Sequence, residues 1–345
     1  MTRFVDRTRM TTTKSIAVIA PNWLGDAVMS LPLVGMLGAA DATVALVAPA
    51  STARVYRGMP EVDELAVLPK RTFTRGMGPR ARYLARTKPG AVVLLPPSLS
   101  SAVGPWLARV GIRVGYRADG RSAFLSRGAF DAAQSRNEHL SGNYLRLGEA
   151  ALAALGIAVP AAFEPPPVRV SRQEHAELDA LFEPARAGRP FAVVVPGATY
   201  GPAKSWPWER YRETVRVLAG RVPVALAGTA AEREMCAAIC AGVDNVTNLA
   251  GETPLGAFLS LLSRAAVVLA NDSGSPHLAA SMGTPVVVLF GSTSPEWTAP
   301  LGPSVDVIRH PVACSPCFRK TCPTQLECFD GITVESVLAA VEGYL

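Results

Sequence analysis

The sequence predicts two successive α/β domains, each built on an open parallel sheet. Three observations lead to this expectation. The 345 residues exceed what one hydrophobic core usually supports. Short apolar, β-branched runs alternate with stretches of helical spacing, and three consecutive prolines at 165–167 interrupt that alternation. We expect a first domain over residues 1–170 and a second over 171–345 that ends in a helix.

The first domain is expected to begin with the buried strand Ser15–Ala20, which stops at Pro21. A stretch of helical spacing follows over 27–37, and the next strand is expected at Thr43–Val47. Further strands at Glu64–Leu68 and Ala91–Leu95, and a helix at Tyr144–Leu155, complete a parallel sheet covered by helices.

The segment Glu164–Pro167 is the expected linker, because consecutive prolines continue neither a helix nor a central strand. The strands expected after it are Phe191–Val195, Val222–Leu226, Ala265–Ala270 and Val286–Phe290, and the closing helix is Val334–Leu345. Two open α/β domains joined in this way would face each other across a cleft. Ligands would bind there, beyond the carboxyl ends of the strands.

Composition and charge narrow the class of protein. Hydrophobic residues make up 49% and charged residues 18%, as in a globular chain. Neither a secretory apolar segment nor eighteen uninterrupted apolar residues occur. We therefore expect a cytoplasmic protein whose six cysteines stay reduced and whose membrane contact, if any, is peripheral to the inner face of the cytoplasmic membrane.

The net charge of +6 is divided unevenly between the two expected domains. Residues 1–170 hold 21 Lys and Arg against 11 Asp and Glu, whereas residues 171–345 hold 13 against 17. The first domain should attract an anionic partner such as a phosphorylated lipid surface, although a solvated basic face without a partner is the alternative. No nucleic-acid motif accompanies the charge, so we expect no nucleic acid as partner. The basic residues are Lys70, Arg71, Arg75, Arg80, Arg82, Arg86, Lys88, Arg109, Arg113, Arg117 and Arg121.

Neither a G-x-G-x-x-G after the first strand nor a Walker A sequence is present, so phosphates would be held by other means. The segment Asn271–His277 follows an apolar strand and precedes a helix. Asp272 and Ser273 suit the helix cap, and Gly283 suits its end. The free amides of residues 273–275, with Gly274 allowing close approach, would suit a diphosphate, and His277 could donate to it. Helix starts of this kind are common, and the alternative for His277 is packing in the core.

The loop after the first strand of the second domain offers a complementary charge. Glycines at 197 and 201 permit a tight loop, Thr199 supplies a hydroxyl, and Lys204 supplies a mobile ammonium that could neutralise phosphate. A solvated lysine is the alternative.

In the first domain, Gly25 and Asp26 place a carboxylate at a helix start, where it would either cap the helix or act as a general base. The helix N-terminus lowers the basicity of such a group, but a weak base suffices when the proton that it accepts becomes acidic late in the reaction.

Four cysteines lie close together near the C-terminus. They could hold structural zinc, stay as thiols or form a disulfide, and since no second C-x-x-C follows the first we expect no metal. Their positions are Cys314, Cys317, Cys322 and Cys328.

Four stretches resemble the lipopolysaccharide heptosyltransferases of glycosyltransferase family 9, particularly their heptosyltransferase II branch. They are PNWLGDAVMSLPLVGML at 21–37, PGATYGPAKSWPWERY at 196–211, NDSGSPHLAASMGTPVVVLFGSTSPEWTAPLG at 271–302 and CSPCFRKTCP at 314–323. They span both expected domains in order. The resemblance implies a GT-B fold, an ADP-heptose donor held mainly by the second domain, a phosphorylated lipid A-core acceptor held by the first, and an inverting transfer that needs neither cofactor nor metal ion.

The resemblance also implies roles for particular residues. Asp26 looks like the catalytic base, with Gly25 beside it, and Lys204 is expected to stabilise the departing ADP. The remaining substrate contacts implied in this way are Thr199, Tyr200, Glu232, Asp272, Ser273, Gly274 and His277. Alternatives are a transferase of the same fold with another acceptor or nucleotide sugar, and a nucleotide-binding module without catalytic activity.

Overall fold

The computed structural model describes residues 14–69, 77–126 and 136–345. The chain divides into two compact units, Met1–Arg169 and Val170–Leu345, so the division falls next to the expected boundary. The expected linker Glu164–Pro167 contains neither helix nor strand, as its prolines dictate.

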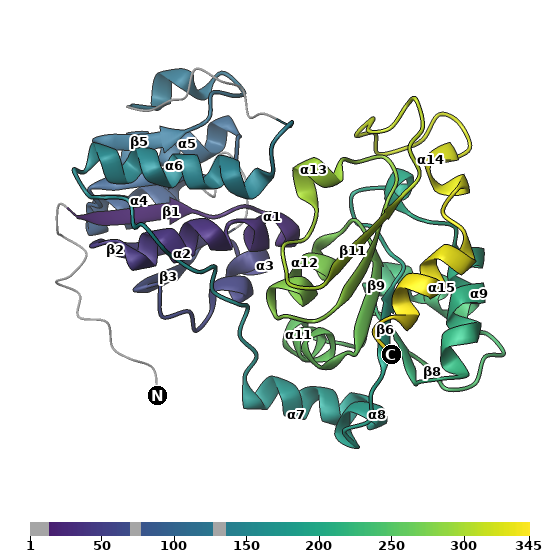
Figure 1. Cartoon of the computed structure of the whole chain (residues 1–345). Helices are drawn as coiled ribbons and strands as arrows, with labels where there is room; N and C mark the ends of the chain where they lie inside the picture. The colour runs from purple at the N-terminus through teal and green to yellow at the C-terminus, as the bar shows by residue number, and fades with distance from the viewer. Residues whose placement is uncertain (1–13, 70–76, 127–135) are drawn as a thin grey trace. The chain divides into compact units, whose positions relative to one another are not determined.

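The first unit is built on a five-stranded parallel sheet with the order β3-β2-β1-β4-β5 (Figure 1). The four strands expected from the sequence are present, and the edge strand β5 was missed because it is short and interrupted by an arginine. The strands are β1 (Ser15–Ile19), β2 (Thr43–Ala48), β3 (Glu64–Val67), β4 (Ala91–Leu94) and β5 (Ile112–Gly115).

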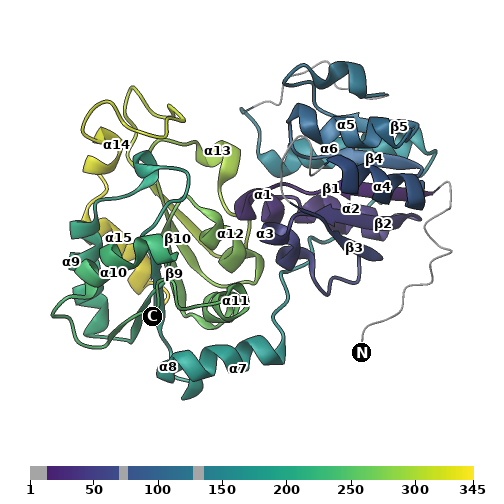
Figure 2. The same ribbon diagram turned by 180° about the vertical axis from the view of Figure 1, so that it is seen from behind.

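Helices cover both faces of this sheet. On one face α2 packs against α6, and on the other α4 packs against α5 (Figure 2). The single helical stretch expected over 27–37 is in fact two helices that meet at Ser30, whose hydroxyl bonds back to the Ala27 carbonyl at 2.7 Å. The helices are α1 (Leu24–Met29), α2 (Leu31–Ala39), α3 (Ala50–Ala53), η2 (Arg54–Tyr56), α4 (Met77–Thr87), α5 (Leu99–Leu107), η3 (Arg121–Phe124) and α6 (Leu140–Ala154).

The second unit is built on a six-stranded parallel sheet with the order β11-β10-β9-β6-β7-β8. Its four expected strands are present. The sequence missed the two edge strands, β8 and β11, whose residues are partly buried or, at three positions of β11, exposed. The strands are β6 (Ala192–Val195), β7 (Val224–Leu226), β8 (Val246–Asn248), β9 (Val267–Asn271), β10 (Val286–Phe290) and β11 (Val305–Arg309).

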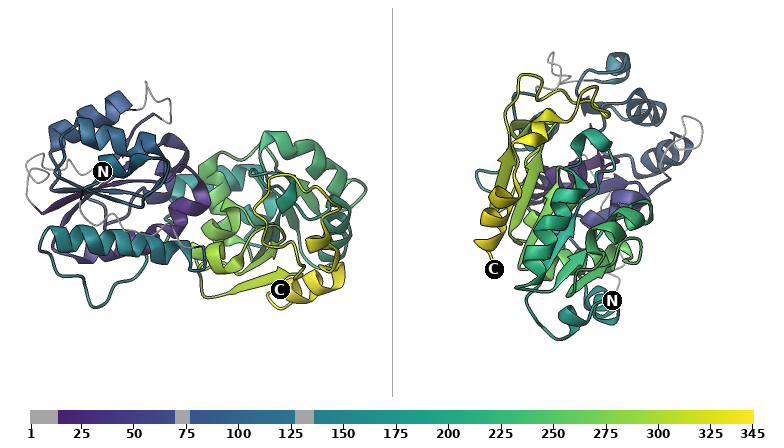
Figure 3. Two further views of the ribbon diagram at one scale, coloured as in Figure 1. Left: turned by 90° about the horizontal axis from the view of Figure 1, so that it is seen from above. Right: turned by 90° about the vertical axis from the view of Figure 1, so that its right-hand side faces the viewer.

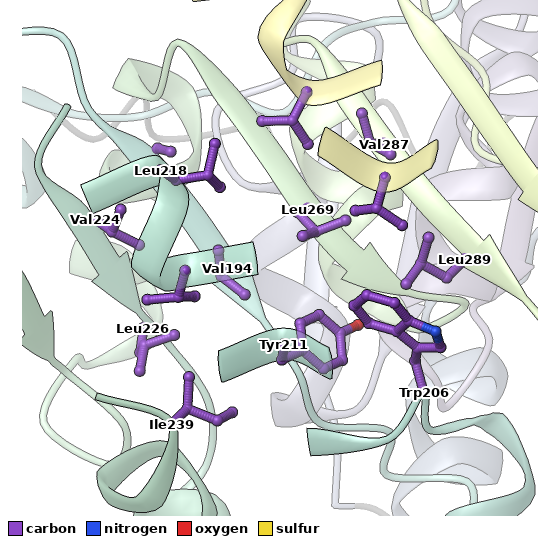
Figure 4. Packing of buried hydrophobic residues seen from close by; sticks show 14 of the residues in the cluster. Val194, Trp206, Tyr211, Leu218, Val224, Leu226, Ile239, Leu269, Val287 and Leu289 are labelled. Carbon is purple, nitrogen blue, oxygen red and sulfur yellow. The ribbon is translucent and has the colours of Figure 1, made fainter. Parts of the chain in front are cut away.

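An apolar cluster of the second unit lies between its sheet and helices α9, α10 and α15. The rings of Trp206 and Tyr211 meet edge to face at 4.9 Å next to strand residues Leu269 and Leu289 (Figure 4). The C-terminal helix, yellow in Figure 3, packs against β10 and α9. The helices are α7 (Arg172–Leu181), α8 (Glu183–Arg186), η4 (Pro202–Lys204), α9 (Trp208–Ala219), η5 (Ala230–Glu232), α10 (Arg233–Cys240), α11 (Leu255–Arg264), α12 (Gly274–Ser281), α13 (Pro295–Thr298), α14 (Glu327–Asp330) and α15 (Val334–Glu342).

The basic character of the first unit needs one correction. Arg121 is fully buried, donates to the Tyr116 carbonyl at 2.7 Å and to the Ser101 hydroxyl at 2.9 Å, and therefore belongs to no solvated basic face. Burial lowers its pKa to about 10, which leaves it charged at neutral pH. Three other members of the expected basic cluster, Lys70, Arg71 and Arg75, lie outside the described residues.

In the part of the chain that is described, no helix is long and apolar enough to cross a membrane.

Candidate functional site

The carboxyl edge of the second sheet gathers most of the residues singled out in the sequence. Strands β10, β9, β6 and β7 are neighbours and run parallel, so the loops that follow them emerge side by side at this edge. Asp272 directly follows β9, Lys204 lies in the loop after β6, and Glu232 lies in the loop after β7.

Lys204 and Asp272 form a nearly buried ion pair at this edge. Lys204 Nζ lies 2.5 Å from Asp272 Oδ2 and 3.3 Å from the Asp272 carbonyl oxygen. The same carboxylate oxygen accepts a hydrogen bond of 2.6 Å from the hydroxyl of Thr293, in the loop after β10. The side chains are only 15% (Lys204) and 4% (Asp272) exposed. The prediction that Lys204 is a mobile ammonium is therefore wrong, because the Asp272 carboxylate holds it.

Asn271 fixes the backbone on which this pair is mounted. Its side chain is fully buried, accepts a hydrogen bond from the Trp206 amide at 3.0 Å, and donates one to the Pro196 carbonyl at 2.6 Å. Both partners belong to the loop that carries Lys204. Because a buried amide that satisfies two backbone groups is costly to displace, the ends of β6 and β9 are held at a fixed spacing.

A helix begins at the end of β9, as the sequence predicts. Helix α12 starts at Gly274 with Ser273 as its N-cap, and Gly283 follows its end with a φ of +83°. The sequence predicted that Asp272 and Ser273 would cap this helix, but no side chain does so. The Asp272 carboxylate is bound to Lys204 and Thr293 instead. The buried Ser273 Oγ forms no hydrogen bond among the described residues. The first amides of α12 therefore point out of the helix without a side-chain cap. His277 is 2% exposed, and its expected role as a phosphate donor remains a prediction.

The loop after β6 places two further expected contacts at the surface. Thr199 and Tyr200 are exposed, and the Tyr200 ring lies 5.2 Å from Lys204 Nζ. The Tyr200 hydroxyl donates to the Phe318 carbonyl at 3.0 Å. Tyr200 is thus tied to a distant segment of the chain, while Thr199 is left facing solvent.

Glu232 is placed by a capping box at the start of the turn after β7. Its Oε2 accepts from the Thr229 amide at 2.6 Å and from the Thr229 hydroxyl at 2.9 Å. A Cβ on Gly197 would lie 1.7 Å from Glu232 Oε1, so a larger residue at that position would displace the Glu232 carboxylate. The carboxylate therefore lies against the loop after β6, and its nucleotide contact remains a prediction.

Asp26 lies at the carboxyl edge of the first sheet. It occupies the first turn of α1, next to Gly25, and is half-buried. The Pro21 carbonyl before it accepts from the Thr52 hydroxyl at 2.9 Å, which fixes the turn. Burial raises the pKa of Tyr56 and of Tyr144 well above the usual range, and the negative charge of Asp26 raises both further. These two phenols consequently stay neutral beside the carboxylate at any physiological pH.

The cysteine cluster contains free thiols. Burial, with the nearby thiols of Cys314 and Cys322, raises the pKa of Cys328 to about 11. Hydrogen bonding to Thr324 lowers the pKa of the exposed Cys322. Among the described residues, no group of three or more His, Cys, Asp or Glu side chains is arranged to hold a metal ion. On α10, Cys236 is buried and Cys240 is half-buried.

Two residues at the second edge were missed in the sequence. Thr293 follows β10 in the same way as Asp272 follows β9, so the strand-end rule could have found it. Lys320 lies within the cysteine-rich stretch at 314–323, for which the sequence analysis considered only the thiols. Its Nζ lies 5.6 Å from the centre of the Tyr200 ring. No sequence signal links Lys320 to Tyr200.

Comparisons with known proteins show the family to which the chain belongs. The family model described as glycosyltransferase family 9 (heptosyltransferase) matches residues 81–327. Lipopolysaccharide heptosyltransferase 2 of Salmonella typhimurium is 31% identical over 309 residues, which cover 85% of this chain and 87% of that protein.

Solved structures give the same result for the fold. The Escherichia coli structure titled ADP-heptose lps heptosyltransferase II superposes with a TM-score of 0.77 at 28% identity, over 96% of this chain and 98% of that one. A family 9 glycosyl transferase from Veillonella parvula shares the fold with a TM-score of 0.80 at 19% identity, over 98% and 99% of the two chains. The expected fold class, GT-B with two Rossmann-like parallel-sheet domains, is confirmed.

Proposed function

Since this chain belongs to glycosyltransferase family 9, the heptosyltransferases, we propose that it transfers a heptose from ADP-heptose to the inner core of lipopolysaccharide, at the heptosyltransferase II step. The observation that carries the proposal is the Lys204–Asp272–Thr293 cluster beside the uncapped start of α12. It combines an ammonium, a carboxylate and free backbone amides, which are the groups needed to bind a diphosphate and a polyhydroxylated sugar together.

The donor diphosphate would bind at the start of α12. The first amides of the helix and its dipole favour an anion, and Ser273 and Gly274 leave the backbone accessible. Lys204 would donate to the phosphates while Asp272 accepts from hydroxyls of the heptose. Departure of ADP is the step in which negative charge develops, and groups held in place beforehand stabilise it without reorganisation. The contacts of Thr199, Tyr200, Glu232 and His277 with the donor belong to this proposal.

Asp26 would act as the base in a single in-line displacement. Its carboxylate accepts the proton of a core-sugar hydroxyl as that oxygen attacks the anomeric carbon, the bond from that carbon to the ADP oxygen breaks, and the configuration inverts. The neutral phenols of Tyr56 and Tyr144 supply no competing charge to this carboxylate. No cofactor enters this reaction, and we assign no metal-binding residue.

The first unit would hold the phosphorylated lipid acceptor at the inner face of the cytoplasmic membrane. Besides the buried Arg121, the segment 77–126 carries seven Lys and Arg residues against one Asp. The exposed Trp106 lies within this segment. Two arginines lie close to Trp106. The Arg109 amide donates to the Trp106 carbonyl at 2.9 Å. The Trp106 ring contacts the Phe124 ring, and the Phe124 carbonyl accepts a hydrogen bond from the Arg113 side chain. Cations around an exposed tryptophan favour an anionic lipid surface.

Transfer can be tested directly by mass spectrometry. The purified chain is incubated with ADP-heptose and a series of truncated core acceptors, and the acceptor that gains the mass of one heptose is identified. We expect transfer to an acceptor that already carries one core heptose. Transfer only from another nucleotide sugar, or only to another acceptor, would favour the alternative of a related transferase. Binding of ADP without any turnover would indicate a nucleotide-binding module.

Membrane contact is tested separately, by sedimentation with vesicles of phosphatidylglycerol or of phosphatidylcholine. Binding should require the anionic lipid and should weaken with salt. Trp106→Ala should reduce it more than Trp208→Ala, which removes an exposed tryptophan of the second unit. Equal binding to both lipids would contradict the proposal.

A further inference from the structure

A short segment of the cysteine-rich region crosses the carboxyl edge of the second sheet. We call residues 315–320 the cysteine strap. On one side it is bound to the loop after β10: the Ser315 hydroxyl donates to the Gly291 carbonyl at 2.6 Å, and the amides of Cys317 and Phe318 donate to the Ser292 carbonyl at 3.0 and 2.8 Å. These contacts lie next to Thr293, which binds Asp272.

On its other side the strap is bound to the loop after β6. The Phe318 carbonyl accepts from the Tyr200 hydroxyl at 3.0 Å, and the Lys320 carbonyl accepts from the Ala203 amide at 3.1 Å. Gly201 allows this approach, because a Cβ there would lie 2.5 Å from the Lys320 carbonyl oxygen. Since β9 lies between β10 and β6 in the sheet, the strap links the two loops that flank Asp272 and the start of α12.

The strap brings a second ammonium to the ring that already contacts Lys204. Lys320 Nζ lies 5.6 Å and Lys204 Nζ 5.2 Å from the centre of the Tyr200 ring. Both distances are within the range of a cation–π contact. Hydrogen bonds on both sides of the strap fix the backbone of Lys320, and its side chain reaches the Tyr200 ring from that fixed point.

The two ammonium groups differ in the charge that they can offer a ligand. Lys204 is paired with the carboxylate of Asp272, so the pair contributes little net positive charge. Lys320 is exposed and forms no ion pair among the described residues. A departing nucleoside diphosphate carries more than one negative charge, and Lys204 compensates at most one of them, at the expense of its pairing with Asp272. A second, uncompensated cation at this edge supplies what the ion pair lacks.

We propose that Lys320 is a second phosphate-binding residue of the donor site, positioned by the cysteine strap and the Tyr200 ring. The proposal rests on the proposed function, in that it assumes a nucleoside diphosphate at the start of α12. It assigns to the cysteine-rich segment a binding role that requires neither a metal ion nor a disulfide.

The test compares ADP with adenosine as ligands of the full chain by isothermal titration calorimetry. Lys320→Gln keeps most of the side-chain length but removes the charge, and it should raise the Kd for ADP about tenfold, as loss of one charge-assisted contact does. The Kd for adenosine, which has no phosphate, should stay unchanged, and Lys320→Arg should restore ADP binding. The KM for ADP-heptose should rise with the Kd for ADP.

The matched control is Arg319→Gln, which removes one positive charge from the neighbouring exposed position. It should leave the Kd for ADP within about twofold of the wild-type value, because charges exposed to water are screened. Three results would overturn the proposal. Both substitutions could weaken ADP binding equally, Lys320→Gln could lose affinity for adenosine together with ADP, or Lys320→Gln could bind ADP as tightly as the wild type. A wild-type chain that binds no ADP would instead refute the proposed function itself.

Discussion

The carboxyl edges of the two sheets follow the same topological rule but are built differently. At the second edge, Lys204, Asp272 and Thr293 come from loops after three different strands, and their side chains bond to one another. At the first edge, Asp26 is a half-buried carboxylate beside phenols held neutral by burial. The groups of the second edge are therefore already bonded to one another, whereas the first edge presents the half-buried carboxylate of Asp26 on a fixed turn.

This difference corresponds to the two chemical tasks in the proposed reaction. A departing diphosphate is stabilised most by charges and dipoles whose positions are fixed before the reaction. Deprotonation of an acceptor hydroxyl needs one base within hydrogen-bonding distance, and its pKa can be low when the hydroxyl becomes acidic late. Three predictions test this division, from the largest expected effect to the smallest, and two further predictions concern the thiols near the strap.

Replacing the base should separate turnover from donor binding. We expect Asp26→Asn to lower kcat by a factor of about 10² to 10⁴, the usual contribution of general acid–base catalysis, while the Kd for ADP stays within about twofold. Steady-state kinetics and calorimetry measure the two quantities. Asp41→Asn, at an exposed position paired with Lys14, is the matched control and should leave kcat unchanged. If Asp26→Asn kept wild-type turnover, the two edges would not divide the chemistry as proposed.

Breaking the buried ion pair should reduce both ADP affinity and stability. Lys204→Met leaves the carboxylate of Asp272 buried without its cation, which should lower the free energy of unfolding by about 3–5 kcal/mol. Urea denaturation of the ligand-free chain measures this loss. The double variant Lys204→Met with Asp272→Asn removes the orphaned charge and should recover most of the stability, but not the affinity for ADP. If the affinity returned as well, Lys204 would have only a structural role.

Removing the hydroxyl of Thr293 should have a smaller effect on the same cluster. Thr293→Val deletes a 2.6 Å hydrogen bond to the Asp272 carboxylate, and a bond to a charged group contributes about 1.5–3 kcal/mol. We expect a higher KM for ADP-heptose, because Asp272 is less firmly oriented, with a smaller loss of stability than in Lys204→Met. Thr298→Val removes only a weak 3.4 Å bond and serves as the control. Equal kinetics in both variants would show that Asp272 is oriented by Lys204 alone.

The smallest expected effect concerns the thiols near the strap. Because its pKa is lowered, exposed Cys322 should be alkylated by iodoacetamide at pH 7 well before Cys328, whose pKa of about 11 keeps it protonated. Peptide mass spectrometry gives the order of reaction. Faster alkylation of Cys328 would contradict its burial.

The same raised pKa fixes the sign of one pH effect on stability. The pKa of Cys328 is higher in the folded chain than the value of about 8.5 for a free thiol. Its contribution to stability is therefore complete below about pH 8.5 and is lost as the pH rises through 11. Cys328→Ala should remove this part of the alkaline decline in a urea titration at several pH values.

The sequence by itself determined much of the fold and the positions of the motifs. Buried strands such as Val286–Phe290 are continuous apolar runs, which identify central parallel strands, and the prolines after Glu164 mark the break between the two units. The same strand-end rule located Asp26 and Asp272, because polar residues that follow a buried strand must lie at the edge of its sheet.

Only the tertiary structure decided which of these residues meet. Lys204 and Asp272 are 68 positions apart, and Tyr200 and Phe318 are 118 apart. Local spacing carries no information about such pairs, since they depend on the order of the strands and on where each loop returns. A loop lysine therefore looked mobile, a buried arginine looked solvated, and Lys320 went unnoticed, because burial and charge pairing are properties of the assembled edge and not of the residues that contribute to it.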